Sequence, residues 1–401
     1  MRKDANPCLL EAMTFPSRYV GLTEARARHG ARVDRLGHFL TQGDAPADAA
    51  VASLAKLPPR AREQAIQVAL SGHGQGVPEA LAALVERCSE VPFWVDFERA
   101  ARGGAVCMRT GMLSGIVLGF KSLVGGYCSP AGNKPLVFSG RLQEVAWRRI
   151  GETGRFVQAV CLPDGMRPGQ EGWRTAVRVR LMHAQVRHLL ARDARWKREE
   201  WGTPISQLDM AGTVLLFSLV LAQGLQALGV ALSREEREDL LHLWRYVGRV
   251  MGVEEELLPA GEREAEALWD LISITQAPPD EDSRTLAHAF ITSPLREART
   301  RTERFVIERC ISICYELSRY LLGDKYADAL GYPRSRWRFT LPALRALVIS
   351  GDRVLHGLPG AEGVTLAAGM AYWQRFIELG LGGVGATFPL PELLRGVPSR
   401  S

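Results

Sequence analysis

The chain has 401 residues, 46% of them hydrophobic, which is enough material for a large buried core in one or two helical domains. Its 50 basic residues outnumber the 44 acidic ones only slightly and are spread along the sequence, so the composition argues against nucleic-acid binding. The seven cysteines are odd in number and lack CxxC spacing, which argues against a disulfide framework and against a zinc site.

Apolar residues recur at helical spacing along most of the chain, whereas no stretch of useful length alternates with the period of two that strands show. The sequence therefore predicts an all-α fold, a large multi-helix bundle. The helices are expected at residues 17–42, 57–70, 78–91, 104–123, 142–160, 173–196, 210–232, 234–251, 302–322, 341–349 and 365–381.

Polar residues at the helix starts indicate where several of these helices begin. Asp96 and Ser233 stand where an N-cap is expected, because their side-chain oxygens can accept hydrogen bonds from the first free backbone N–H groups. Residues 276–283, QAPPDEDS, form a linker-like break that ends one helix. Asp282 or Ser283 is expected to cap the next one.

The domain organisation expected from these patterns is simple. Residues 1–90 form an N-terminal helical segment that packs on the domain formed by residues 91–401, and the two make one compact unit. Residues 1–16 lack the apolar run of a secretory signal peptide, which favours a cytoplasmic protein. The sequence does not indicate an oligomeric state.

Two stretches are unusually apolar. Residues 210–232 carry no charge over a length that can span a membrane. Gln223 and Gln226 nevertheless favour the buried centre of a helical bundle, so no stable membrane span is expected. Residues 104–123 carry a glycine at every fourth position, which allows a neighbouring helix or a flat ligand to approach Gly111, Gly115 and Gly119 closely.

One histidine, His183, falls on an apolar stripe of the helix predicted for residues 173–196. The other members of the stripe are Ala176, Val179, Val186 and Leu190. The remaining faces are expected to carry Arg178, Arg187, His188 and Arg192. An inward histidine is either a core residue hydrogen-bonded to a carbonyl or carboxylate, or an axial ligand of a metal or haem. The helix alone allows both.

Polar side chains also interrupt the inward stripe of the preceding helix, residues 142–160. This stripe consists of Ala146, Arg149, Thr153, Phe156 and Val160. A buried guanidinium group needs an anionic or polar partner, which is either a core carboxylate or a bound ligand. Inward Arg149, Thr153 and His183 on two successive helices form a more specific constellation than any one of them.

The sequence around these positions resembles a known family. Residues 148–156 read RRIGETGRF and residues 178–187 read RVRLMHAQVR, and both segments are similar to MpaB-type and rubber oxygenases, which include the latex clearing proteins. Thr153 and His183 are 30 residues apart, in agreement with the latex clearing pattern. Further similar segments begin at Pro92, Gly126 and Arg234, with the sequences PFWVDFERAARGG, GYCSPAGNKPLVFSGRL and REEREDLLHLWRYVGRVMGVEEELLP.

The resemblance implies an all-helical protein with a globin-like core that encloses haem b and uses O2 on a small lipophilic, alkene-bearing substrate such as an isoprenoid. Carried over by position, His183 is the proximal ligand of the haem iron, and Arg149 and Thr153 lie in the distal pocket. By charge, Arg178 and Arg187 are possible partners for the haem propionates.

The chain also departs from the latex clearing pattern. Glu152 stands where those enzymes have a lysine just before the threonine, and it is the nearest candidate for a catalytic acid or base. Asn133 and Lys134 stand where their glutamate base is expected. Two alternatives therefore remain open: a haem protein without oxygenase chemistry, acting as a sensor, a carrier or a peroxidase-like protein, and a helical scaffold without haem.

Overall fold

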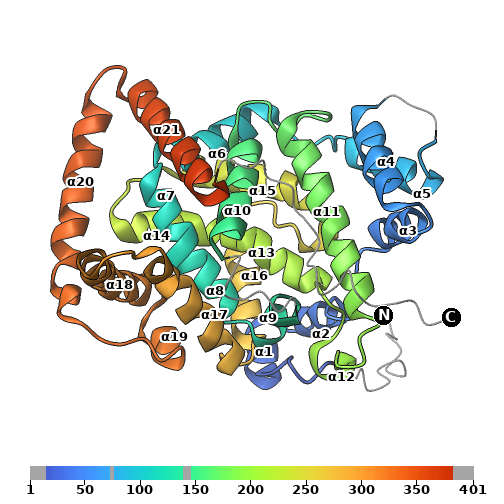
Figure 1. The fold of residues 1–401 in the computed structure, drawn as a ribbon, viewed down its shortest axis with the longest axis horizontal. Coiled ribbons are helices and arrows are strands. Elements are labelled where there is room, and N and C mark those ends of the chain that lie inside the picture. Colours follow the sequence, from blue (N-terminus) through green and yellow to red (C-terminus); the bar gives the residue numbers. More distant parts are fainter. Residues whose placement is uncertain (1–14, 73–75, 139–145, 383–401) are drawn as a thin grey trace, which may run out of the picture.

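The computed structural model describes residues 15–72, 76–138 and 146–382, which fold into helices joined mostly by short loops (Figure 1). Within these ranges there is no β-strand. The nearest approach to one is an isolated antiparallel bridge between Tyr19 and Gln276. The prediction of an all-α fold is confirmed.

The first five helices, blue in Figure 1, are α1 (Leu22–His29), α2 (Arg32–His38), α3 (Ala45–Leu54), α4 (Pro59–Ser71) and α5 (Glu79–Ser89). The single helix predicted for residues 17–42 is wrong, because the chain breaks at Gly30, which has a φ of 62°. No helix was predicted at α3. Asp44 caps it by accepting a hydrogen bond from the Ala47 backbone N–H.

A second group of helices is α6 (Phe97–Arg109), α7 (Met112–Val117), the π-helix η1 (Leu118–Leu123), α8 (Val124–Tyr127) and α9 (Pro130–Phe138). Asp96 caps α6 as predicted. The helix predicted for residues 104–123 instead bends by 86° between α6 and α7, where Gly111 has a φ of 44°. Its glycine face is filled by protein, since Gly115 meets Tyr372 and Gly119 meets Phe290. The alternative of a flat ligand on this face is therefore wrong.

The centre of the molecule consists of α10 (Ala146–Cys161), α11 (Glu171–Leu190), α15 (Arg234–Val250) and the last helix, α21 (Ala361–Leu381). α15 packs along α6, and α10 packs against α21, α11 and α6. Three of the largest fully buried side chains, Trp173, Trp244 and Trp373, come from α11, α15 and α21. Ser233 caps α15 through a capping box with Glu236, as its sequence predicted.

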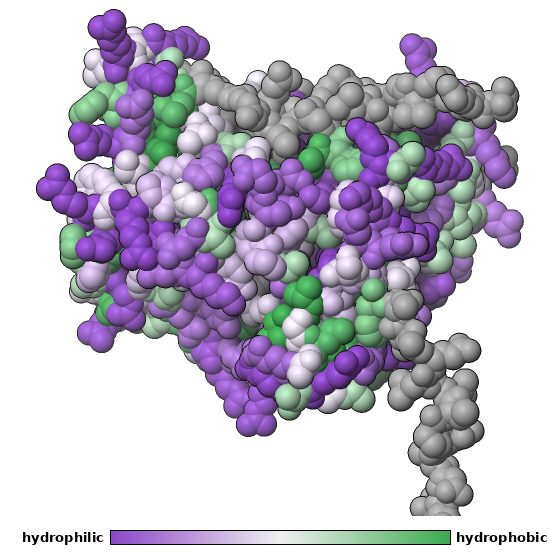
Figure 2. All heavy atoms as spheres, turned by 90° about the horizontal axis from the view of Figure 1, so that it is seen from below, coloured by the Kyte–Doolittle hydropathy of each residue, from purple (hydrophilic) through white to green (hydrophobic). Residues whose placement is uncertain are grey.

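The apolar stretch at residues 210–232 forms two helices, α13 (Gln207–Phe217) and α14 (Leu219–Leu228), which meet at Ser218. By length and composition, one helix of the described chain, Gln207–Leu228, could cross a membrane, and a bent pair at Phe97–Tyr127 would make a second. Within the apolar window of Gln207–Leu228, 67% of the residues are buried inside the protein, as in the core helix of a bundle. The face shown in Figure 2 is mainly hydrophilic, with small hydrophobic patches.

The remaining elements are α12 (Arg198–Trp201), η2 (Glu255–Leu257), α16 (Glu262–Thr275), α17 (Glu281–Thr292), η3 (Ser293–Glu297), α18 (Arg301–Leu322), α19 (Asp324–Ala329), η4 (Arg336–Phe339) and α20 (Leu341–Gly357). The cap of α17 is Asp280, which accepts from the Ser283 backbone N–H at 2.9 Å, so the predicted caps Asp282 and Ser283 are wrong. α20 is also longer than predicted.

The division of the chain near residue 90 stays a prediction.

Candidate functional site

His183 lies on the buried side of α11, as its position on the helix predicted. The other members of its stripe, Ala176, Val179, Val186 and Leu190, are all buried. α11 packs against α10, α3 and α15, so the histidine lies on a helix surrounded by other helices. An apolar setting of this kind withdraws the imidazole ring from bulk water.

The imidazole of His183 has no hydrogen-bond partner in the described part of the chain. Its Nδ1 is fully buried and unpaired, which costs free energy in a purely structural site. Burial, and after it the positive charge of Arg187, lower the pKa of His183 to about 4, against the opposing effect of Asp44. The ring is therefore neutral at pH 7 and has a lone pair available, as metal coordination requires. The alternative of a core histidine bonded to a carbonyl or carboxylate is not observed.

Arg187, one helical turn after His183, is buried, although the sequence placed it on an outer face of α11. Its Nε donates to Asp48 Oδ1 at 2.8 Å and its Nη1 to the Ile205 carbonyl at 3.0 Å. Its Nη2 is buried without a partner among the described residues. The prediction of an outer position for Arg187 failed because Asp48 of α3 neutralises its guanidinium group. Without this carboxylate the charge would stay in water.

Arg178 is half-buried and pairs with Glu63 of α4, with 3.0 Å between Nη1 and Oε1. Arg178 and Arg187 were both expected to be available to anionic groups of a ligand. In the structure each guanidinium group already pairs with a protein carboxylate, Glu63 for Arg178 and Asp48 for Arg187. Arg187 Nη2 is the donor of this pair that is buried without a partner among the described residues.

On α10 the structure reverses the expected orientation of two neighbours. Thr153, predicted to face inward, is exposed, whereas Glu152 is buried and accepts a hydrogen bond from Arg148 Nε at 3.2 Å. The reason is the packing of α21, because Gly151 contacts the backbone of Gly380. This close approach rotates α10 so that the side of Glu152 turns toward the protein.

Arg149, next to this turn, is half-buried. Its positive charge lies near enough to Tyr127 to lower the pKa of that phenol, which burial raises more strongly. No hydrogen bond or ion pair of Arg149 is present within residues 15–72, 76–138 and 146–382. Glu152 pairs with Arg148, whereas the charge of Arg149 has no protein counter-charge in these ranges.

The position expected for a glutamate base is structural in this chain. Asn133 is buried, and its Nδ2 donates to the Tyr127 carbonyl and to Ser283 Oγ. The neighbouring Lys134 Nζ pairs with Asp280 at 2.9 Å and also with Asp282. These contacts tie α9 to the start of α17, and the carboxylates nearby, Asp280 and Asp282, pair with Lys134.

Two other histidines are structural. His242 is buried on α15 and its Nε2 accepts a hydrogen bond from the Asp96 backbone N–H at 3.0 Å. His288 lies between the Tyr315 hydroxyl, at 2.7 Å, and the Leu330 carbonyl, at 3.0 Å. No group of three or more His, Cys, Asp or Glu side chains in the described ranges could hold a metal ion. Haem iron needs no such group, because a single histidine can hold it.

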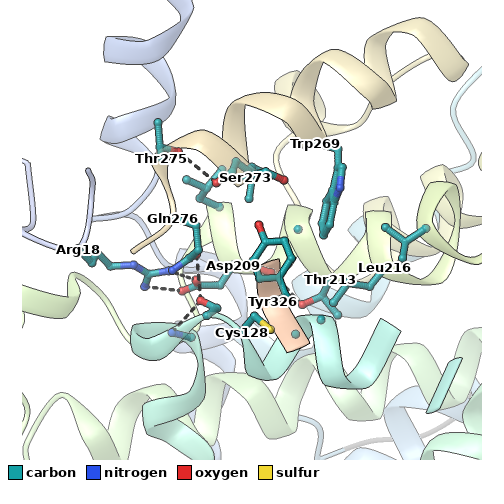
Figure 3. Close-up of a pocket in the computed structure, with 18 of the residues that line it drawn as sticks. Arg18, Cys128, Asp209, Thr213, Leu216, Trp269, Ser273, Thr275, Gln276 and Tyr326 are labelled. Atoms are coloured by element: carbon teal, nitrogen blue, oxygen red, sulfur yellow. Dashed lines mark hydrogen bonds and ion pairs between the residues drawn. The ribbon is translucent and has the colours of Figure 1, made fainter. Parts of the chain in front are cut away.

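A cavity of about 210 Å³ lies elsewhere (Figure 3). None of His183, Arg149, Thr153 and Glu152 lines it. The sequence did not identify it, because its walls come from segments far apart in the chain. The one available signal was Lys121, a charge within an otherwise apolar stretch.

Comparisons with known proteins agree with this fold. The family model described as "ER-bound oxygenase mpaB/B'/Rubber oxygenase, catalytic domain" matches residues 108–349. The rubber oxygenase of Streptomyces sp. (strain K30) is 26% identical over 260 residues, which are 64% of this chain and 61% of that protein. The structure of latex clearing protein LCP in the closed state is similar in fold, with a TM-score of 0.65 and 22% identity over 84% of this chain and 91% of that one.

Proposed function

This chain belongs to the family of ER-bound oxygenase mpaB/B' and rubber oxygenase catalytic domains, and on that premise we propose that it is a haem b-dependent oxygenase. The substrates are O2 and a small lipophilic molecule with an alkene, such as an isoprenoid. The similarity to a rubber oxygenase supports this class of substrate, although the match spans about three-fifths of that relative's length.

The imidazole of His183 carries the proposal. It is neutral, it lies on an apolar stripe, and neither of its nitrogens has a hydrogen-bond partner in the described chain. These properties fit the single protein ligand of haem b, which requires an unprotonated ring nitrogen. Bound at this position, haem b would supply the activation of O2.

The residues around His183 would hold and shield the reacting groups. The apolar stripe of α11 excludes water from the histidine side. Arg149 offers N–H donors without a protein counter-charge in the described ranges, so it can hold an anionic or polar group of the ligand. The hydroxyl of Thr153 is exposed and accessible to the same ligand. Arg178 and Arg187 would contribute to a propionate site through the guanidinium nitrogens that do not bond Glu63 and Asp48, such as Arg187 Nη2.

Glu152 is the candidate group for proton transfer. Its carboxylate accepts from Arg148 Nε at 3.2 Å, which orients it on the buried side of α10. It would hold a proton during the reaction only after this ion pair opens. Glu152 therefore acts as an acid or base in this proposal, next to Thr153 in the sequence.

A second candidate function is a haem protein without oxygenase chemistry. The observation that favours it is that Asn133 and Lys134, which stand where a glutamate base is expected, are bonded to Ser283 and Asp280 and are not acidic. O2 uptake and carbonyl products in the presence of an isoprenoid panel distinguish the two functions. Haem binding without substrate-dependent O2 uptake would support the second.

The ultraviolet–visible spectrum tests the cofactor. We expect protein expressed with a haem supply to show a Soret band, and His183→Ala to lose this band while it keeps its far-ultraviolet helicity. His242→Ala is the matched control, because His242 is also buried but is hydrogen-bonded within the protein. A colourless wild-type protein that takes up no added haem would overturn the assignment.

A further inference from the structure

The cavity of about 210 Å³ is lined by η1, α8, α9, α13, α14, α16, α18 and α19, together with the segment that precedes α1 (Figure 3). Glycines of α8, α9 and α13 leave room on one side of it. A large part of its wall is apolar, and the side chains that form this part are Leu216, Val220, Trp269, Ile272 and Leu322. A wall of this kind favours a ligand with a hydrocarbon part.

Lys121 brings a positive charge to this cavity. It lies on the π-helix η1, a type of element that occurs often at functional sites. Its Nζ donates to the Leu321 carbonyl at 2.6 Å, which uses one of the three donors of an ammonium group. Lys121 makes no ion pair with any described residue, and burial lowers its pKa. The structure thus holds a partly buried cation without a counter-charge.

The one carboxylate among the residues that line the cavity does not neutralise Lys121. Asp209 accepts hydrogen bonds from both terminal nitrogens of Arg18, with 3.2 Å between Nη1 and Oδ2. Its Oδ2 also accepts from Ser206 Oγ at 2.8 Å, as part of the capping box of α13. Arg18 and Asp209 therefore neutralise each other, and the net charge on the cavity wall is positive.

A second unpartnered donor faces the same cavity. Gln276 Nε2 is fully buried without a hydrogen bond in the described structure. The amide is oriented by Ser129, whose Oγ accepts from the Gly132 backbone N–H and donates to Gln276 Oε1 at 3.1 Å. This arrangement holds Oε1 and leaves Nε2 for an acceptor that the described protein does not provide.

We propose that this cavity is a binding site for a small, largely apolar carboxylate. The carboxylate pairs with Lys121 Nζ, the hydrocarbon part lies against Trp269 and its apolar neighbours, and Gln276 Nε2 donates to an acceptor oxygen of the ligand. An engineered cavity of about 150 Å³ accommodates benzene, so this one suits a ligand of roughly eight or nine heavy atoms. His183 does not line this cavity.

Calorimetric titration of the purified full-length protein with hexanoate, 5-oxohexanoate and hexanamide tests the proposal. We expect hexanoate to bind at least tenfold more tightly than the amide, which has the same shape but no charge. Lys121→Met should weaken hexanoate at least tenfold and change hexanamide by less than twofold. Lys325→Met removes the same charge from an exposed site on α19 and should change neither.

Gln276 is tested by the second oxygen of 5-oxohexanoate. The oxo acid should bind more tightly than hexanoate to the wild type, and Gln276→Leu should abolish this difference. Leu216→Trp fills the cavity and should abolish binding of all three compounds. This variant tests the site independently in case Lys121→Met does not fold. Equal affinity for acid and amide in the wild type, or no binding of any compound at millimolar concentration, would overturn the proposal.

Discussion

Arg180 of α11 holds the carboxylate of Asp44 in a two-bonded ion pair, with 2.7 Å from Nε to Oδ2 and 2.9 Å from Nη2 to Oδ1. Both side chains are buried, and Arg180 Nη1 also donates to the Val250 carbonyl at 3.1 Å. The ion pair therefore connects α11 to the start of α3 and the end of α15. It lies one turn before His183 and fixes the helix that carries the candidate ligand.

Asp44→Ala should destabilise the protein strongly. The change leaves the Arg180 guanidinium buried without a counter-charge, which costs about 3–5 kcal/mol, and removes the cap of α3. Urea unfolding measures the loss. Asp34→Ala is the control, since Asp34 pairs with Arg26 at the surface, where an ion pair contributes about 1 kcal/mol or less. Similar losses for both variants would contradict the structural role of the Asp44 pair.

Gly252→Ala should disturb the same ion pair. Gly252 has a φ of 86°, and a Cβ there would lie 2.6 Å from Arg180 Cζ and closer still to Asp44 Oδ2. Gly360 has a φ of 76° but nothing within 4 Å of such a Cβ, so Gly360→Ala carries only the left-handed strain of about 1–2 kcal/mol. We expect a larger drop in the free energy of unfolding for Gly252→Ala. Equal drops would mean that the ion pair moves aside without cost.

His242 should make stability depend on pH. Burial lowers the pKa of this histidine, and the charge of Arg99 lowers it further. The unfolded chain therefore binds the proton more readily than the folded protein, so stability is lost as the pH falls below the ordinary histidine value of about 6.5. Urea unfolding between pH 7 and pH 5 should show a smaller loss for His242→Gln than for the wild type. Parallel curves would exclude His242 as a source of the dependence.

Local signals in the sequence predicted several helix starts and the inward position of His183. Asp96 and Ser233 cap the helices that follow them because an N-cap depends on residues within one turn. The apolar stripe of α11 likewise follows from helical periodicity alone. These features need no knowledge of the rest of the chain.

Contacts between distant segments decide what the sequence could not predict. Arg187 is buried because Asp48, 139 positions away, neutralises it. Glu152 turns inward and Thr153 outward because α21, at the other end of the chain, packs against Gly151. Periodicity gives the faces of one helix, but the neighbour on each face depends on the whole fold. The cavity at Lys121 escaped prediction for the same reason.

Arg149→Met tests the proposed ligand pocket without a change of fold. Arg149 has no ion pair in the described ranges, so its loss should leave the urea unfolding curve unchanged. If Arg149 holds an anionic or polar group of the bound ligand, substrate-dependent O2 uptake should fall at least tenfold, as expected for the loss of a charged hydrogen bond. Arg155→Met is the matched control, because Arg155 lies on the same helix and pairs with Glu171 near the surface. Unchanged O2 uptake in Arg149→Met, beside an active control, would place Arg149 outside the site.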